Sequence, residues 1–486
     1  MPMRLFALLI VSVLLGACAA STGQEQANAS TKPGEPVPMD TRHEITIVVP
    51  NVGTDTAYLA YYQGATQYLK DTTVGHDGTF VFAGDEPLPP GMYLAVFPPA
   101  NRYFDFIVNR DQTFTLRTDT ADFAGNMKVE GSEENQVFYD HIAYLAAQRA
   151  KATPLNGQLQ GLAEGSPERE AVQKQLEAIN EEVMAERKRL KTERSDLLAA
   201  RILTGSDGPE VPDPPADADE YWGYRYYKGH FFDYLDLSDE GLMRSPIMER
   251  KITEYLDNLT AQHPDSLIEA VDLLIEKARP NDETFRYLVS TLVNKYAEKA
   301  NELMGMDGVY LHIVEKYYAS GQAWWLDEEQ LADLITKAEK LSPIIIGRPG
   351  LDFTITDVNG QPQSLYGVKA DWIILYFWDY DCGRCKKVTP ELAKLFPTYK
   401  NRGVQLFTVN INGDNEVWKE KLKEYGLMDA GGIHTSDPYR KSGFDKKYNI
   451  NSTPKIFILD SNHIIRYKWI GVDQLPEILD RELSKL

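Results

Sequence analysis

Residues 372–388 read WIILYFWDYDCGRCKKV, and this stretch decides the fold of the C-terminal part of the chain. Its first seven residues form a continuous apolar run, which is the pattern of a parallel strand covered on both faces. After a short loop come Cys382 and Cys385, and apolar residues then recur at helical spacing, namely Val388, Leu392, Leu395 and Phe396. The stretch therefore predicts a strand, a loop and a helix, with the first cysteine at the helix N-terminus.

This position suits thiol chemistry. The thiolate is the nucleophile, and unpaired backbone N–H groups with the positive end of the helix dipole favour the anion. Two intervening residues keep the second sulfur close enough to attack a mixed disulfide. A Cys-x-x-Cys motif can also form half of a zinc site, which needs further cysteine or histidine ligands. Here His434 and His463 are isolated, and the chain has only one further cysteine, Cys18. We therefore expect a redox-active pair with no metal and no other cofactor.

Residues 404–410, which read VQLFTVN, add a second strand after the helix and complete an α/β redox layout. With Thr453-Pro454 downstream, residues 377–387 resemble the TlpA/ResA group of exported, thioredoxin-like thiol-disulfide oxidoreductases. The resemblance covers residues 344–486. It implies that Cys382 attacks and that Cys385 resolves.

The same resemblance assigns roles to three other residues. Trp378 matches the aromatic residue before the active site, and we expect it to contact substrate. Pro454 matches a cis-proline that faces the sulfurs, although an ordinary trans turn proline is the alternative. The backbone of Thr453 would then pair with an extended substrate peptide.

The sequence lacks the buried acidic residue that is part of the thioredoxin pattern. Many thioredoxins place a buried acid six residues before the first cysteine, where Tyr376 stands here. The TlpA/ResA group often has a carboxylate after the next strand, and the resemblance makes Asp414 the nearest candidate for such a proton acceptor. Arg384 and its basic neighbours favour the thiolate, whereas Asp379 and Asp381 oppose it. Dithiol proteins span about −270 to about −120 mV, so both reduction and oxidation of clients stay open.

The N-terminus carries an export signal. Arg4 precedes an apolar core at residues 5–15, which is too short to span a bilayer. The following Leu-Gly-Ala-Cys sequence, which ends at Cys18, resembles the lipobox of bacterial lipoproteins, and this implies lipidation of Cys18. An ordinary cleaved secretory peptide is the alternative. Residues 1–18 are thus the expected signal, residues 19–42 a flexible tether, and the expected location is the membrane surface facing the periplasm.

Two further domains are expected upstream. Short alternating strands in residues 43–128 predict an antiparallel β-sandwich. Residues 129–343 follow a helical period, with a linker rich in proline and acidic residues at 205–220. Apolar spacing predicts a long amphipathic helix, either packed or an arm rather than a stable coiled coil, through Val172, Leu176, Ile179, Val183, Leu190 and Leu197. The fold class is multidomain: a β-sandwich, an all-α region and a thioredoxin-like α/β domain at 344–486.

The composition of the chain limits the classes of molecule that it is expected to bind. The 486 residues suggest roughly three domains. The formal net charge of −21 disfavours binding to nucleic acid. We expect the partners to be envelope proteins that bear disulfides or thiols, a separate redox partner, and the membrane through the lipid anchor.

Two other functions stay open at this point. Because most of the mature chain lies outside residues 344–486, the protein could be a binding or scaffold lipoprotein that uses its redox module for docking or sensing. A peroxidase of the peroxiredoxin type would have its attacking cysteine in a Thr-x-x-Cys context. Here Asp379, Tyr380 and Asp381 precede Cys382 instead.

Overall fold

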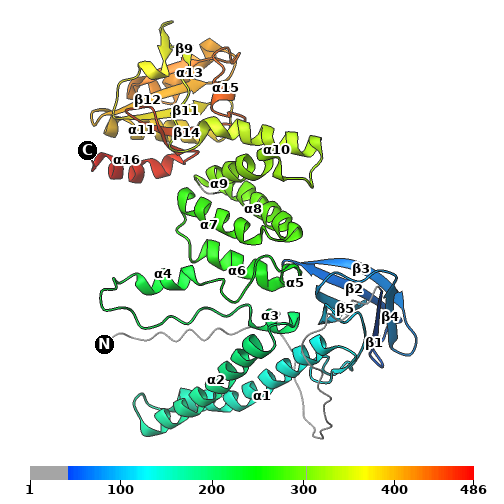
Figure 1. The fold of residues 1–486 in the computed structure, drawn as a ribbon. Coiled ribbons are helices and arrows are strands. Elements are labelled where there is room, and N and C mark those ends of the chain that lie inside the picture. Colours follow the sequence, from blue (N-terminus) through cyan, green and yellow to red (C-terminus); the bar gives the residue numbers. More distant parts are fainter. Residues whose placement is uncertain (1–41, 303, 486) are drawn as a thin grey trace. The chain divides into compact units, whose positions relative to one another are not determined.

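The computed structural model describes residues 42–302 and 304–485 (Figure 1). The expected signal peptide with Cys18 lies outside these residues, as does the expected tether apart from Arg42. None of the helices within the described ranges is long and apolar enough to cross a membrane. The chain divides into two compact units, one of Met1–Leu259 with Glu276–Phe285 and one of Thr260–Ile275 with Arg286–Leu486.

The first unit begins with two four-stranded sheets, whose strand orders are β4-β1-β7-β8 and β3-β2-β5-β6. The strands are β1 His43–Val48, β2 Thr56–Gln63, β3 Thr66–Val74, β4 Thr79–Gly84, β5 Gly91–Phe97, β6 Arg102–Val108, β7 Thr113–Arg117 and β8 Lys128–Glu130. Phe80 and Phe82 alternate with exposed residues in β4 and share one core with Leu59 and Phe106 of the other sheet. The predicted β-sandwich is confirmed. It is not wholly antiparallel, because β1 and β7, which no hairpin joins, pair in parallel.

Helices follow the sandwich within the same unit. They are α1 Glu133–Gly161, α2 Pro167–Glu193, α3 Leu198–Thr204, α4 Trp222–Gly229, α5 Glu240–Met243 and α6 Pro246–Asp257. The side chains of Ser132 and Ser166 cap α1 and α2, which form a hairpin (Figure 1). The helix predicted through Leu197 ends at Glu193, because the backbone leaves helical geometry at Arg194.

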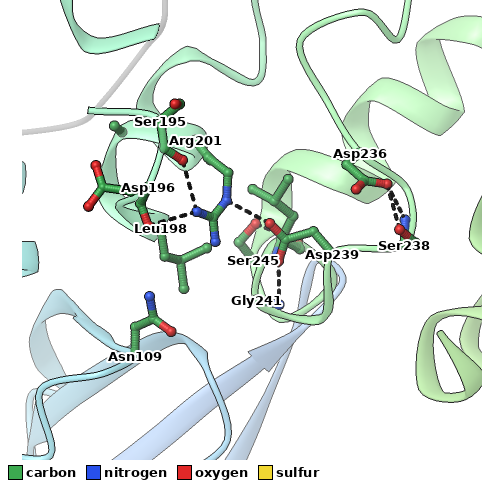
Figure 2. Close-up of polar contacts among 12 residues, drawn as sticks. Asn109, Ser195, Asp196, Leu198, Arg201, Asp236, Ser238, Asp239, Gly241 and Ser245 are labelled. Carbon is green, nitrogen blue, oxygen red and sulfur yellow. Dashed lines mark hydrogen bonds and ion pairs between the residues drawn. The ribbon is translucent and has the colours of Figure 1, made fainter. Parts of the chain in front are cut away.

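Polar contacts fix these helices. The buried Glu134 carboxylate accepts hydrogen bonds from two backbone amides at the start of α3 and from the side-chain amide of Asn109, at 2.6 Å. Figure 2 shows Arg201 of α3 bonded to the carboxylate of Asp239, at 2.7 Å, and to the Ser195 carbonyl, at 3.1 Å. Asp239 in turn caps α5. Helix α3 is thus tied to α1 on one side and to α5 on the other.

The second unit starts with helices. They are α7 Pro264–Ala278 and α8 Asp282–Glu302, which belong mostly to this unit, then α9 Met306–Ile313, the π-helix η1 Val314–Gln322, α10 Glu328–Leu341 and the short η2 Ser342–Ile344. Lys468 near the C-terminus forms a buried ion pair with Asp307 of α9 and donates a hydrogen bond to the Ile344 carbonyl. The helical region expected at residues 129–343 is therefore divided, and its part from Thr260 onward, apart from 276–285, packs with the C-terminal fold.

The remaining residues form a five-stranded sheet with helices around it. Its order is β13-β12-β11-β14-β15, with β11, β12 and β13 parallel and β14 and β15 antiparallel. The elements are β9 Thr354–Thr356, β10 Pro362–Ser364, η3 Leu365–Gly367, β11 Trp372–Trp378, α11 Cys385–Leu395, α12 Pro397–Lys400, β12 Val404–Asn410, α13 Asn415–Glu424, α14 Leu427–Ala430, β13 Ile433–Ser436, α15 Phe444–Lys447, β14 Lys455–Asp460, β15 Ile465–Lys468, η4 Val472–Gln474 and α16 Leu475–Leu483.

The central strand β11 explains the apolar run at 372–378. All seven of its residues are buried, and they alternate between two apolar clusters. Ile374, Tyr376 and Trp378 belong to one cluster, and Ile373, Leu375 and Phe377 belong to the other. The strand is covered on both faces, as predicted, and the predicted multidomain fold class is confirmed.

Candidate active site

The two cysteines of the C-terminal fold lie where β11 passes into α11. Cys385 is the first residue of α11, and Cys382 lies in the preceding turn, where its carbonyl accepts a hydrogen bond from the amide of Lys386 at 3.0 Å. Both thiols are free. Within the described ranges, no group of three or more histidine, cysteine, aspartate or glutamate side chains is arranged to hold a metal ion.

The sulfurs differ in exposure and in contacts. Cys385 is fully buried, whereas Cys382 is half-buried. The backbone amide of Cys385 donates a hydrogen bond to Sγ of Cys382 at 3.2 Å. On its other side the Cys382 thiol donates to the carbonyl of Thr453 at 3.4 Å. The reachable sulfur is thus Cys382, and it lies between a helix N-terminus and the loop before β14.

These surroundings shift the two pKa values in opposite directions. Burial raises the pKa of the Cys382 thiol, but hydrogen bonds with the side chain and the amide of Cys385 outweigh burial, so that the pKa is lowered. Burial raises the pKa of Cys385 to about 12, and its hydrogen bond with Cys382 acts in the same direction. The arrangement therefore makes Cys382 the more readily ionised of the two thiols.

The loop before β14 completes this face. The Thr453–Pro454 peptide bond is cis, and both residues are half-buried. Lys455 follows as the first residue of β14 and pairs with Phe377 near the end of β11. Because β11 and β14 are neighbours, this loop lies beside the turn that contains Cys382, although the two segments are far apart in sequence.

The structure corrects the role expected of Trp378. Its side chain is fully buried and packs between the rings of Tyr376 and Tyr425, with ring centres 6.3 and 6.2 Å away. A side chain without exposed surface cannot contact a substrate. Trp378 is the last residue of β11, and its side chain forms part of the apolar core that also contains Cys385.

Asp414 has a different kind of partner from the one expected. Its side chain is exposed and accepts hydrogen bonds from the amides of Glu416 and Val417, at 2.9 and 3.1 Å, which makes it the N-cap of α13. Among the hydrogen bonds of the described residues, none joins its carboxylate to Cys382 or Cys385. The carboxylate therefore has a capping role, and the sequence spacing did not reveal it.

Tyr376 is a site residue to which the sequence analysis gave no role. It was noted only because it replaces the buried acid of many thioredoxins. Its hydroxyl is 2.8 Å from the hydroxyl of Thr389, and both residues are fully buried in the core that contains Cys385. Burial raises the pKa of Tyr376 well above its ordinary value, and the nearby Cys385 raises it further. A pair of neutral hydroxyl groups thus lies where many thioredoxins place a buried acid.

Three family models match this chain. Residues 346–468 match the AhpC/TSA family. Residues 43–138 and residues 169–341 match two domains of unknown function, DUF4369 and DUF5106. The AhpC/TSA match covers the five-stranded sheet and both cysteines.

Two curated proteins named as thiol-disulfide oxidoreductases are also similar to part of this chain. Thiol-disulfide oxidoreductase ResA of Geobacillus kaustophilus is 27% identical over 144 residues, which is 29% of this chain and 79% of that protein. ResA of Bacillus thuringiensis is 28% identical over 156 residues, which is 31% of this chain and 82% of that protein.

Two solved structures are also similar to this chain. A domain of a possible thiol-disulfide isomerase from Cytophaga hutchinsonii is 29% identical, covers 30% of this chain and 97% of that one, and has a TM-score of 0.28. A thioredoxin-like protein from Bacteroides caccae is 20% identical, covers 56% of this chain and 97% of that one, and has a TM-score of 0.43.

The fold and the dithiol together define a thioredoxin-like enzyme at the C-terminus. The protein is a thiol-disulfide oxidoreductase whose C-terminal domain has a thioredoxin-like fold and is similar to ResA.

Proposed function

We propose that the protein is an exported, lipid-anchored oxidoreductase that exchanges disulfides with proteins of the cell envelope through Cys382 and Cys385. The contrast between the two sulfurs supports this proposal. One is half-buried with a lowered pKa, and the other is fully buried with a raised pKa. A nucleophile and a resolving group need this division of roles.

In the first step the Cys382 thiolate attacks one sulfur of a client disulfide. The client S–S bond breaks, a mixed disulfide forms between Cys382 and the client, and the other client sulfur leaves as a thiolate that takes up a proton. The backbone of Thr453 supports the client here, because its carbonyl already lies 3.4 Å from the attacking sulfur. An extended client segment would add alongside this loop by backbone pairing.

In the second step Cys385 loses its proton and attacks Sγ of Cys382. The mixed disulfide breaks, a Cys382–Cys385 disulfide forms, and the second client sulfur leaves and is protonated. Two electrons have passed from the dithiol to the client. A dithiol-bearing redox partner must then return two electrons to the enzyme, and the reverse sequence oxidises a client dithiol.

The location is inferred from the sequence alone. The apolar core at residues 5–15 and the lipobox-like ending at Cys18 support export and lipidation. Cys18→Ser is the corresponding test. In cells fed a radiolabelled fatty acid, the unchanged protein should carry label and sediment with membranes, and the variant should carry none. Equal labelling of both proteins contradicts lipidation at Cys18.

The exchange chemistry is tested with the chain that lacks the first 18 residues and with insulin as the disulfide substrate. We expect catalysed reduction in the presence of dithiothreitol, and a trapped insulin adduct with Cys385→Ala that reductant releases. Cys382→Ala is the matched control, because it keeps one thiol in the same site but removes the nucleophile. Absence of both catalysis and adduct would refute the proposed function.

A further inference from the structure

Two cationic residues belong to the two segments that meet at Cys382. Arg384 is the exposed residue before α11, and Lys455 begins β14 directly after Pro454. No ion pair or hydrogen bond of either side chain with an acidic group occurs among the described residues. Arg384 and Lys455 are close enough for their charges to repel each other.

The surroundings of Lys455 disfavour the charged form of its side chain. It is half-buried, and its Nζ lies 4.3 Å from the centre of the Trp469 ring. Burial lowers its pKa, and repulsion by Arg384 and Lys468 lowers it further. Lys468 has its own counter-ion in Asp307, but Lys455 has only the face of an indole ring.

The acids near the site are already engaged on the other side of Cys382. Asp379 accepts hydrogen bonds from the amide of Asp381 at 2.7 Å and from the side chain of Asn412 at 2.8 Å. Asp381 lies 3.7 Å from the ammonium group of Lys386. The cations by the Thr453 loop are therefore left without compensation, in a chain whose formal net charge is −21.

We propose that Arg384 and Lys455 select client proteins in which acidic residues flank the reacting cysteine. This proposal rests on the function proposed above and names the substrate class of the same site. A client segment that pairs along the backbone of Thr453 lies next to Lys455, while its sulfur meets Cys382 beside Arg384. Carboxylates on that segment supply the counter-charge that the site lacks.

The test uses three peptides that each contain one intramolecular disulfide and are otherwise identical. Glutamate, glutamine or lysine flanks one cysteine. The rate constant for reduction of each peptide is measured with the chain that lacks the first 18 residues. At low ionic strength we expect the acidic peptide to react roughly 3- to 10-fold faster than the basic one, as is typical of partly exposed charge pairs. At about 1 M salt, where the screening length is about 3 Å, the ratio should approach one.

Arg384→Gln with Lys455→Met should bring the same ratio close to one at low salt. Because Arg384 lies between the two cysteines, its replacement changes thiol reactivity as well, and the ratio of two peptides within one variant cancels that change. Lys394→Gln with Lys423→Gln is the matched control. It removes two exposed cations of the same fold, from the later part of α11 and from α13, and should leave the ratio unchanged.

Each outcome decides one question. Equal rates for the three peptides with the unchanged protein refute charge selection but leave disulfide exchange intact. A ratio that persists in the Arg384 and Lys455 variant, or that falls equally in the control, assigns selection to other cations of the protein instead and also refutes the proposal. Failure to reduce even the glutamine peptide refutes the proposed function itself.

Discussion

The hydroxyl groups of Tyr376 and Thr389 lie 2.8 Å apart inside the C-terminal core, and Thr389 is one helical turn beyond Cys385. Residues four apart on a helix share a face, so Thr389 brings the Tyr376 hydroxyl to the side of α11 that carries the buried thiol. A neutral donor at this place stabilises a Cys385 thiolate without adding a buried charge. The pair therefore bears on the second step of exchange.

Tyr376→Phe keeps the ring and removes the hydroxyl. We expect resolution of the mixed disulfide to slow about fivefold, because one hydrogen bond is worth about 1 kcal/mol. Rapid-quench gels without reductant measure the lifetime of the mixed disulfide. Tyr399→Phe is the control, since its hydroxyl contacts Asp480 rather than a cysteine. Unchanged lifetimes in Tyr376→Phe would rule out this role for the hydroxyl.

The opposite pKa shifts predict a difference in alkylation. The rate of Cys382 alkylation by iodoacetamide should rise with pH, and its midpoint should lie below the midpoint of an ordinary thiol. Cys385 should stay unmodified until the protein is unfolded, because its thiol is buried and its pKa is about 12. Mass spectrometry distinguishes the two sites. Equal reactivity of both cysteines in the folded protein would contradict the assigned roles.

Cys385→Ala should raise the pKa of Cys382. The variant loses the side-chain hydrogen bond that lowers this pKa but keeps the backbone amide bond. The midpoint of the alkylation profile of Cys382 should therefore move to higher pH. A midpoint that stays in place would mean that the backbone amide alone stabilises the thiolate.

Two substitutions of Asp414 distinguish its structural role as a helix cap from the chemical role of a proton acceptor. Asp414→Ala should lower the free energy of unfolding by about 1 kcal/mol, because it removes the cap of α13. Asp414→Asn retains an acceptor for the amides and should leave both stability and exchange rate close to those of the unchanged protein. If Asp414→Asn instead slows insulin reduction at unchanged stability, the carboxylate is the proton acceptor that the sequence suggested.

The buried pair of Lys468 and Asp307 should be costly to break from one side. Lys468→Met leaves a buried carboxylate without its partner, and we expect a loss of about 3–5 kcal/mol in the free energy of unfolding. Lys468→Met combined with Asp307→Leu should cost less than the single change, since no unpaired charge remains. Urea unfolding followed by tryptophan fluorescence measures both.

An exposed ion pair in the same fold provides a comparison for the stability cost of breaking the buried pair. Arg402 and Asp480 lie 2.8 Å apart with largely exposed side chains, so Arg402→Met should cost no more than about 1 kcal/mol. Equal losses for Lys468→Met and Arg402→Met would show that burial does not set the strength of the inner pair.

The sequence by itself determined the strand at 372–378, a helix after the cysteine motif and the division into sheet, helical and α/β regions. It placed the first cysteine at the N-terminus of that helix, whereas in the structure the helix starts at the second cysteine, Cys385. These features depend on neighbours along the chain: a continuous apolar run, helical spacing and two cysteines three positions apart. The related-family pattern added Thr453 and Pro454 as the loop that faces the sulfurs.

Only the tertiary structure decided which groups surround the sulfurs. Thr453 meets Cys382 across 71 positions of sequence, and Lys468 meets Asp307 across 161. Trp378 lies inside the core, Asp414 caps a helix, and Tyr376 pairs with Thr389, although the family resemblance suggested a substrate contact, a proton acceptor and a missing acid. Burial and hydrogen-bond partners arise when distant segments pack together, and no periodicity along one segment contains that information.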